Sequence, residues 1–294
     1  MFSQLIYKLM YSIVVLLMVI ITVSSIIYLA PVDPTRLSFG QMADAGTIEK
    51  KKERLGLDKP LPVQLMYYIN DISPISIYRT SELSELPVTK SALSLSSTHS
   101  LVLKMPYLRE SFQSGRKVSE LIGEALPKTL ILAFASLLFA LLIGIPLGII
   151  CALNRDKMAD RAIIAFSTLG VSLPSYIPAI MFAVFFGYVW SSLTGLDVQG
   201  SIIELNDLGN EEIRIRNLIL PVLALGIRPV AMITQLSRSA FLDVMNQEYI
   251  KTAKAKGVRL VSLLYRHALP NASVTIISAS SGWLATLIAG SYFV

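Results

Sequence analysis

Five long apolar segments limit the fold of this chain more than any other feature of its sequence. They are predicted at residues 11–30, 129–153, 161–190, 217–236 and 272–294. Each is long enough to cross a bilayer, because a spanning helix needs about 20 residues. Backbone N–H and C=O groups in lipid must find partners within the protein, which favours helices. The sequence therefore predicts an all-α membrane protein, a polytopic bundle of five spans.

The composition agrees with this interpretation. Hydrophobic residues make up 53% of the 294 residues and charged residues only 16%, and the mean hydropathy is +0.61. The net charge of +6 would suggest nucleic acid in a soluble protein, but the excess falls largely in loops next to the membrane, so no nucleic-acid partner is predicted. The single cysteine, Cys151, excludes an internal disulfide and is expected to be buried.

The segments between the spans predict a topology. Residues 1–10 are expected to be a cytoplasmic N-terminus, residues 31–117 a long external loop, and residues 118–294 the membrane core. The first span is longer than the apolar region of a signal peptide, so it is expected to remain uncleaved. Alternation around Ala92–Leu103 leaves open a small β or amphipathic element in the external loop.

A basic segment, residues 237–271, separates the last two spans and is expected to be cytoplasmic. Within it Tyr249, Ile250, Ala253 and Gly257 share one helix face at spacings of three, four and seven. Gly257 is expected to end this helix, because glycine reaches left-handed conformations at little cost. A second short helix then leads into the next span. Such a helix–glycine–helix elbow predicts a docking surface for a soluble partner.

The same segment resembles the "EAA" loop of permease subunits of binding-protein-dependent ABC importers. That loop reads E-A-A, three residues, Gly, nine residues, then I-x-L-P. Lys251-Thr252-Ala253 stand at the E-A-A places before Gly257, and His267, Leu269 and Pro270 stand at the I-x-L-P places. Lys251 and His267 depart from the general consensus.

The departures match the oligopeptide/dipeptide branch of this family, which reads roughly Y-[VI]-[RK]-T-A-x-A-K-G followed by R-H-A-L. Tyr249–Gly257 and Arg266–Leu269 fit that pattern. Two further motifs resemble the amino-terminal signature of the same branch: L-x-P-x-D-P at Leu29–Pro34 and L-G-L-D-x-P-L-P-V-Q at Leu55–Gln64. The resemblance thus extends over nearly the whole chain.

The resemblance implies a permease subunit of an ATP-driven importer that moves di- or oligopeptides across a bacterial inner membrane, with its N-terminus inside. It implies a second homologous permease, two ATP-binding subunits that hold ATP and Mg, a solute-binding protein, and a lipid bilayer as partners. No catalytic, cofactor or metal residue is expected in this chain. Because the family continues with a sixth helix, the C-terminus is expected to be truncated. The residues implied to couple to the ATPase are Glu248, Tyr249, Thr252, Ala253, Ala255, Lys256, Gly257, Arg266, His267, Ala268, Leu269 and Pro270.

Two places within the spans are candidates for the translocation path. The run Leu173–Pro178 interrupts the third span, and a broken helix often lines a water-filled path. The side chains expected to line it are Ser172, Pro174, Ser175 and Tyr176. Arg228 falls near the middle of the fourth span, where a charge is expensive. The alternatives are a simple kink for the break, and snorkelling or pairing with another subunit for Arg228.

Two small motifs have simple interpretations. Gly144 and Gly148 form G-x-x-x-G, which predicts either a close helix-packing face or, with Pro146 between them, a kink. The acids Asp156 and Asp160, like the pair Glu211–Glu212, are interpreted as solvated turn residues.

The sequence also allows other functions. The same branch includes importers of nickel, opines and glutathione. A secondary transporter driven by an ion gradient would need acids inside the spans, and the five predicted spans have none between their ends. A nonconducting remnant is a third hypothesis. The chain has no G-x-x-x-x-G-K-[ST] motif, so it is not expected to bind nucleotide by that route.

Overall fold

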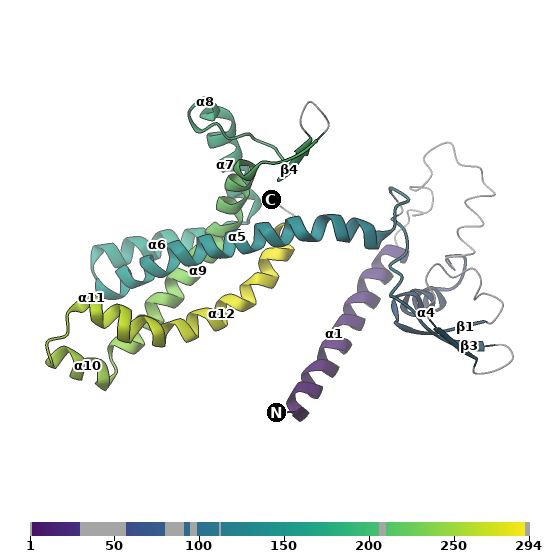
Figure 1. Cartoon of the computed structure of the whole chain (residues 1–294), viewed down its shortest axis with the longest axis horizontal. Coiled ribbons are helices and arrows are strands. Elements are labelled where there is room, and N and C mark those ends of the chain that lie inside the picture. Colours follow the sequence, from purple (N-terminus) through teal and green to yellow (C-terminus); the bar gives the residue numbers. More distant parts are fainter. Residues whose placement is uncertain are drawn as a thin grey trace. The chain divides into compact units, whose positions relative to one another are not determined.

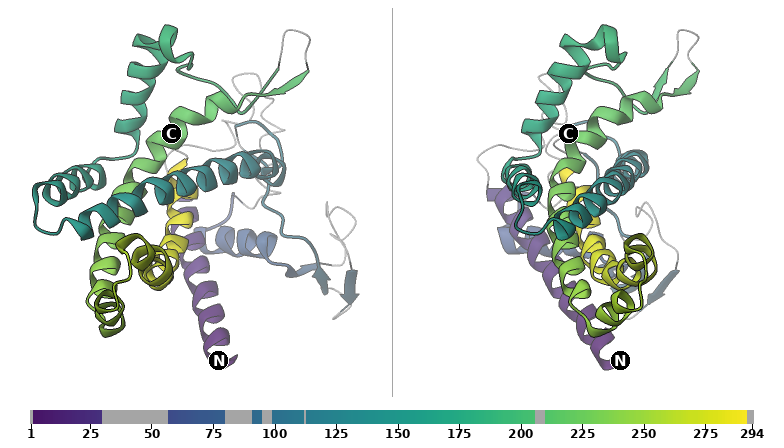
Figure 2. Two further views of the ribbon diagram at one scale, coloured as in Figure 1. Left: turned by 60° about the vertical axis from the view of Figure 1, so that its left-hand side comes forward. Right: turned by 90° about the vertical axis from the view of Figure 1, so that its left-hand side faces the viewer.

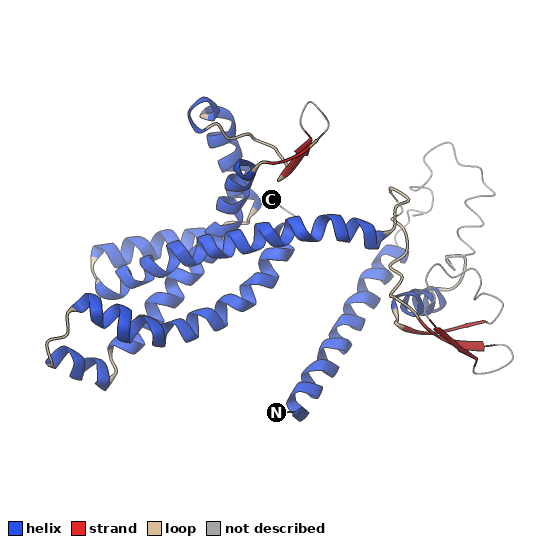
Figure 3. Ribbon diagram, in the orientation of Figure 1, coloured by secondary structure: helices blue, strands red, loops and turns tan. Residues whose placement is uncertain are grey.

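Helices dominate the described part of the chain (Figure 3). The structure is a computed structural model that describes residues 2–29, 57–79, 91–94, 99–111, 113–205 and 210–291. The chain divides into two units, Met1–Glu124 and Ala125–Val294. The boundary lies inside helix α5 (Val118–Leu153), slightly later than the sequence places it. Most of the Leu29–Pro34 motif, and Leu55 and Gly56 of the second motif, lie outside the described residues.

The first unit begins with one long helix, α1 (Phe2–Leu29). The apolar side chains along Ser3–Ile27 are almost all exposed, as a helix surrounded by lipid requires. The helix starts earlier than the predicted span. It contacts α4 (Leu61–Ile72), which has proline in its first turn, where the missing N–H costs no helical hydrogen bond.

A small antiparallel sheet completes the first unit (Figure 1). Strand β3 (His99–Leu103) lies between β1 (Ile75–Arg79) and β2 (Ser91–Ser94), in the order β1-β3-β2. Of the two alternatives that the sequence leaves open around Ala92–Leu103, the structure therefore has strands. Arg109 donates from Nε to Asp71 at 2.8 Å, which links the end of α4 to the chain after β3.

The second unit holds the remaining elements. The predicted third span is broken into two helices and a π-helical segment, and a two-stranded antiparallel hairpin precedes the fourth span. The elements after α5 are α6 (Met158–Ser172), α7 (Tyr176–Phe182), η3 (Ala183–Val189), α8 (Ser191–Thr194), β4 (Ile203–Leu205), β5 (Glu211–Ile213), η4 (Ile215–Leu218), α9 (Ile219–Met245), α10 (Glu248–Ala255), α11 (Leu260–Leu263), η5 (Leu264–Ala268) and α12 (Leu269–Gly290).

The described helices include four that are long and apolar enough to cross a membrane, and the bent α6–α7–η3 pair makes a fifth if it is counted as one span. The prediction of a polytopic helical membrane protein is confirmed. The two small sheets are additions to it, and both lie outside the candidate spans.

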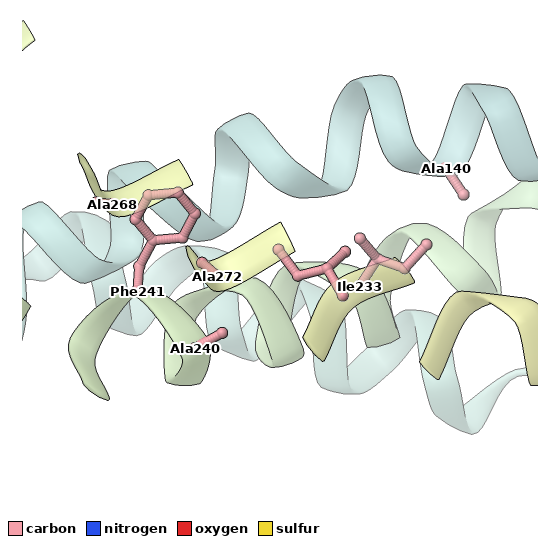
Figure 4. Close-up of a cluster of buried hydrophobic side chains, with 7 residues drawn as sticks. Ala140, Ile233, Ala240, Phe241, Ala268 and Ala272 are labelled. Atoms are coloured by element: carbon pink, nitrogen blue, oxygen red, sulfur yellow. The ribbon is translucent and has the colours of Figure 1, made fainter. Parts of the chain in front are cut away.

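Helix α9 is the centre of the second unit, because α6, α7 and α12 all pack against it (Figure 2). Its candidate span is also the most buried of the four. The main cluster of buried side chains joins α5, α9, η5 and α12 and is rich in alanine (Figure 4). Small residues let helices approach closely in lipid, where burial of apolar side chains gives little driving force. The members are Ala140, Ile233, Ala240, Phe241, Ala268, Ala272 and Ile276.

The G-x-x-x-G motif of α5 lies in this packing. A methyl group on Gly148 would lie 2.8 Å from the carbonyl oxygen of Thr234, and one on Gly144 would lie 2.9 Å from Cγ2 of Ile233. Both distances are too short for a side chain, and helix α5 continues through Pro146 without ending. The structure therefore has the close packing face that the motif predicts.

Candidate functional site: the elbow

The elbow consists of α10, the turn at residues 256–259, α11 and η5, and it lies between α9 and α12 (Figure 1). It is shorter than the predicted loop, because α9 continues to Met245 and so includes residues 237–245. At its other end, α11, η5 and α12 follow one another without a break from Leu260 to Gly290. The elbow is therefore held between two long helices.

Helix α10 ends in a glycine cap of the Schellman type. The N–H of Gly257 donates to the carbonyl oxygen of Lys254 at 3.0 Å, and the N–H of Val258 donates to that of Ala253 at 3.2 Å. Gly257 has φ +73°, a left-handed conformation that is costly for residues with a Cβ atom. The predicted position and conformation of this glycine agree with the structure.

The face predicted for α10 is divided in the structure. Ile250 is completely buried and anchors the helix, while Tyr249, the residue before it, is 43% exposed. Ala253 is half-buried, and Ala255, Lys256 and Gly257 are exposed. Glu248 accepts a salt bridge from Lys251 at 2.7 Å, and Thr252 donates to the carbonyl oxygen of Glu248 at 3.0 Å. Both charges are exposed, so the pair contributes at most about 1 kcal/mol to stability.

The elbow has two arms: α10 is the first, and α11 with η5 is the second. The second arm presents exposed apolar side chains that the sequence reasoning missed. Leu260, Val261 and Tyr265 are 51%, 65% and 68% exposed, while Leu263 and Ala268 are completely buried. The short apolar run at residues 260–265 is visible in the sequence, but only the packing of the buried members shows which side chains face outward.

The other predicted residues of this arm have mixed positions. Arg266 is exposed, and His267 and Leu269 are half-buried. Pro270 lies in the first turn of α12, where proline is tolerated. Asn271 donates from Nδ2 to the carbonyl oxygen of His267 at 2.7 Å. These residues join the elbow firmly to α12.

The break in the third span is sharp. Helices α6 and α7–η3 meet at an angle of 106°. Ser172, Pro174 and Tyr176 are exposed and Ser175 is half-buried, and Ser172 donates to the carbonyl oxygen of Thr168 at 2.9 Å. An angle this large is more than the simple kink that the sequence leaves as the alternative.

Arg228 lies on the part of α9 that packs against the end of α6. Gly170, just before the break, packs on α9 beside Arg228: a methyl group there would lie 3.7 Å from the carbonyl oxygen of Ile227 and 3.3 Å from Cβ of Ala231. The Arg228 side chain is exposed on α9, and half-buried Met232 and Gln235 follow it at helical spacing. The structure therefore places Gly170, about one turn before the break, against the turn of α9 that carries Arg228.

A buried ion pair links α6 and α9, and it corrects the interpretation of Asp160 as a solvated turn acid. Asp160 is 2% exposed. Arg238 donates to it twice, from Nε to Oδ1 and from Nη2 to Oδ2, both at 2.6 Å. The backbone N–H of Asp156 also donates to Oδ2, at 2.9 Å. Sequence reasoning missed the pair because its members lie 78 residues apart.

Together these features define the class of the protein: a multi-pass helical membrane subunit with a broken span, a charge near the break, and a capped basic elbow between two long helices. Residues 144–294 match the family model described as the inner membrane component of binding-protein-dependent transport systems. Residues 1–133 match the model of the N-terminal part of such components. The chain belongs to this family of transport permeases.

Curated relatives agree over nearly the whole chain. A peptide transport system permease protein of Brucella abortus (strain 2308) is 31% identical over 281 residues, which cover 95% of this chain and 77% of the relative. A D,D-dipeptide transport system permease protein of Escherichia coli (strain K12) is 30% identical over 87% of this chain and 71% of the relative. A glutathione transport system permease protein of Pectobacterium atrosepticum is 28% identical over 100% of this chain and 81% of the relative. The prediction of an ABC importer permease of the oligopeptide/dipeptide branch is confirmed.

Proposed function

We propose that this chain moves di- or oligopeptides, delivered by a solute-binding protein, across the inner membrane of a bacterium with its N-terminus inside. It works beside a second homologous permease, and two ATP-binding subunits that hold ATP and Mg dock on the cytoplasmic elbow. Closure of the ATPase pair moves the elbow, and the spans swing between inward-open and outward-open arrangements. The main support for this proposal is the structure of the elbow.

Three properties of the elbow support docking. Exposed apolar side chains at Tyr249, Val261 and Tyr265 offer a contact surface of the kind that partner proteins bury. The cap at Gly257 holds the two arms at a defined angle. Exposed basic residues of the same segment favour a position of the elbow at the cytoplasmic face. They are Lys251, Lys254, Lys256, Arg259 and Arg266.

The relatives favour a peptide as the solute. The three quoted above are described as permeases for peptides, D,D-dipeptides and glutathione, and all three solutes carry peptide bonds and a free carboxylate. An importer of nickel or opines is the second candidate within the branch. Uptake of a labelled dipeptide and of nickel, in cells with and without this gene, separates the two.

A substitution that introduces a charged side chain on the exposed apolar surface of the elbow tests the docking proposal. Val261→Glu should remove the ATP-binding subunits when the complex is purified in detergent, because a carboxylate in an apolar contact loses its hydration without gaining a partner. ATP-dependent dipeptide uptake should be lost as well. Ile213→Glu, at a 69% exposed position in the β4–β5 hairpin, is the control and should leave copurification unchanged. Full retention of the ATP-binding subunits by Val261→Glu would contradict docking at this surface.

We further propose that the break at residues 173–175 and Arg228 line the path, where the guanidinium attracts the carboxylate of the passing peptide. An exposed arginine at this depth is unfavourable against lipid and favourable against water or an anion.

Arg228→Gln should lower dipeptide uptake about tenfold and Arg228→Lys much less, because a charge–carboxylate contact contributes roughly 1.5–3 kcal/mol and lysine keeps the charge. The measurement is initial uptake at equal amounts of permease in the membrane. Lys128→Gln, at an exposed position of α5, is the control. Equal uptake by Arg228→Gln and the wild type would place Arg228 outside the path.

A further inference from the structure

The C-terminal part of α9 is tied to three other parts of the second unit. Arg238 binds Asp160 at the start of α6. On α5, a methyl group on Gly148 would lie 2.9 Å from the backbone nitrogen of Arg238. Phe241, one turn further along α9, is 1% exposed and packs in the core cluster with Ala268 of the elbow. The short piece of helix that leads into the elbow therefore also holds the end of α5 and the start of α6.

Around the ion pair, the α5–α6 turn is built to keep Asp160 in place. Asp156, in this turn, has φ +65°, and its N–H donates to Asp160. Cys151, at the end of α5, is buried and close enough to interact electrostatically with both Asp160 and Arg238. The Asp160 carboxylate is thus held by its own turn as well as by Arg238, while the Arg238 side chain remains 26% exposed.

A buried ion pair contributes little net stability to helix packing, because apolar side chains of similar size often stabilise the same contact as well or better. The bidentate geometry instead fixes an orientation, because two parallel N–H···O bonds hold the guanidinium plane and the carboxylate plane at a defined angle to one another. The pair therefore restrains rotation and sliding of α6 on α9. This restraint acts on the part of α9 that leads directly into the elbow.

We propose that Asp160 and Arg238 form a coupling latch, a pair of positioning residues that makes the α5–α6 hairpin move with α9 when the ATP-binding subunits displace the elbow. The latch stays closed throughout the transport cycle. Without the ion pair, the elbow still moves, but the α5–α6 hairpin, whose second helix is the first half of the broken span, does not move with it. ATP is then hydrolysed without transport. This inference rests on the proposed docking of ATPase subunits at the elbow.

The first test measures dipeptide molecules moved per ATP hydrolysed, in proteoliposomes that contain the complete complex and a tritiated dipeptide. Asp160→Asn keeps the size of the side chain and should lower this ratio about tenfold, within the range of 5- to 150-fold typical of coupling between sites. ATP hydrolysis itself should continue. The charge-exchanged double variant Asp160→Arg with Arg238→Asp should recover part of the ratio. An unchanged ratio in Asp160→Asn would overturn the latch.

The second test uses one preparation with and without a cross-link, so differences in folding cannot affect the comparison. Asp160→Cys and Arg238→Cys are combined in a Cys151→Ser background, which removes the single natural cysteine. A short bifunctional thiosulfonate should bridge the two cysteines and raise the number of dipeptide molecules moved per ATP hydrolysed. Reduction of the bridge should lower this number again. Transport that stops on bridging would show that the pair must open, and would also overturn the latch.

Failure of the latch and failure of the proposed function are distinguishable in these assays. If the proposed function is wrong, the wild-type complex shows no ATP-dependent dipeptide uptake. If only the latch is wrong, wild type and Asp160→Asn move equal amounts of dipeptide per ATP.

Discussion

Gly148→Leu is expected to prevent stable folding of the second unit and to remove the protein from the membrane fraction. A first side-chain carbon at this position would already lie 2.8 Å from the carbonyl oxygen of Thr234 and 2.9 Å from the nitrogen of Arg238. Both are backbone atoms, so no side-chain rotation can relieve the contact. Overpacking by a few carbons costs about 1–3 kcal/mol where neighbours can shift, and here the whole α9 helix would have to move.

Such a loss is large beside the total stability of a domain, which is about 5–15 kcal/mol. The measurement is the amount of full-length protein in membranes and its melting temperature in detergent. Gly123→Leu, in the same helix but with no atom within 4 Å of the added carbon, is the matched control and should accumulate normally. Equal accumulation of the two variants would show that α5 and α9 do not pack as described.

Gly257→Val is expected to abolish ATP-dependent uptake while the protein still inserts at wild-type levels. The left-handed conformation at φ +73° costs a residue with a Cβ atom about 1–2 kcal/mol, and a β-branched one is strained further. The strain is local, since the hydrogen bonds that it opens are those from Gly257 and Val258 to the end of α10. The two arms of the elbow would then lose their angle and with it the docking geometry.

Gly257→Asn separates two reasons for a glycine at this place. Asparagine tolerates the left-handed conformation, and nothing lies within 4 Å of an added Cβ atom. If the cap is what matters, Gly257→Asn should keep more than about half of the uptake, because the conformational cost is small. If Gly257→Asn is as inactive as Gly257→Val, the explanation by the cap is wrong, and close approach of a partner at Gly257 determines the residue instead. Uptake and copurification of the ATP-binding subunits, at equal membrane levels, are the two measurements.

Much of the architecture was open to prediction because it follows from local rules. Apolar runs of spanning length must be helical in lipid, so the number and order of the spans could be read before any contact was known. The position and conformation of Gly257 follow from one residue's lack of a side chain. The family could be identified because its motif occupies consecutive residues, Tyr249–Gly257 and Arg266–Leu269.

Other features could not be predicted, because they depend on which faces meet. The division of α10 into buried Ile250 and exposed Tyr249, and the exposure of Val261 and Tyr265 on the second arm, result from the packing of the elbow against its own helices. Periodicity places such residues on a helix but does not say which face the rest of the protein covers.

The sequence by itself determined the class of fold, the place of the elbow and the family, since each depends on residues that are neighbours along the chain. Only the tertiary structure decided the role of Asp160. In sequence it is one acid in a polar turn; in the fold it is 2% exposed and bound by Arg238, 78 residues away. A carboxylate's surroundings are set by whatever the chain brings to it, and no local pattern records a partner on another helix.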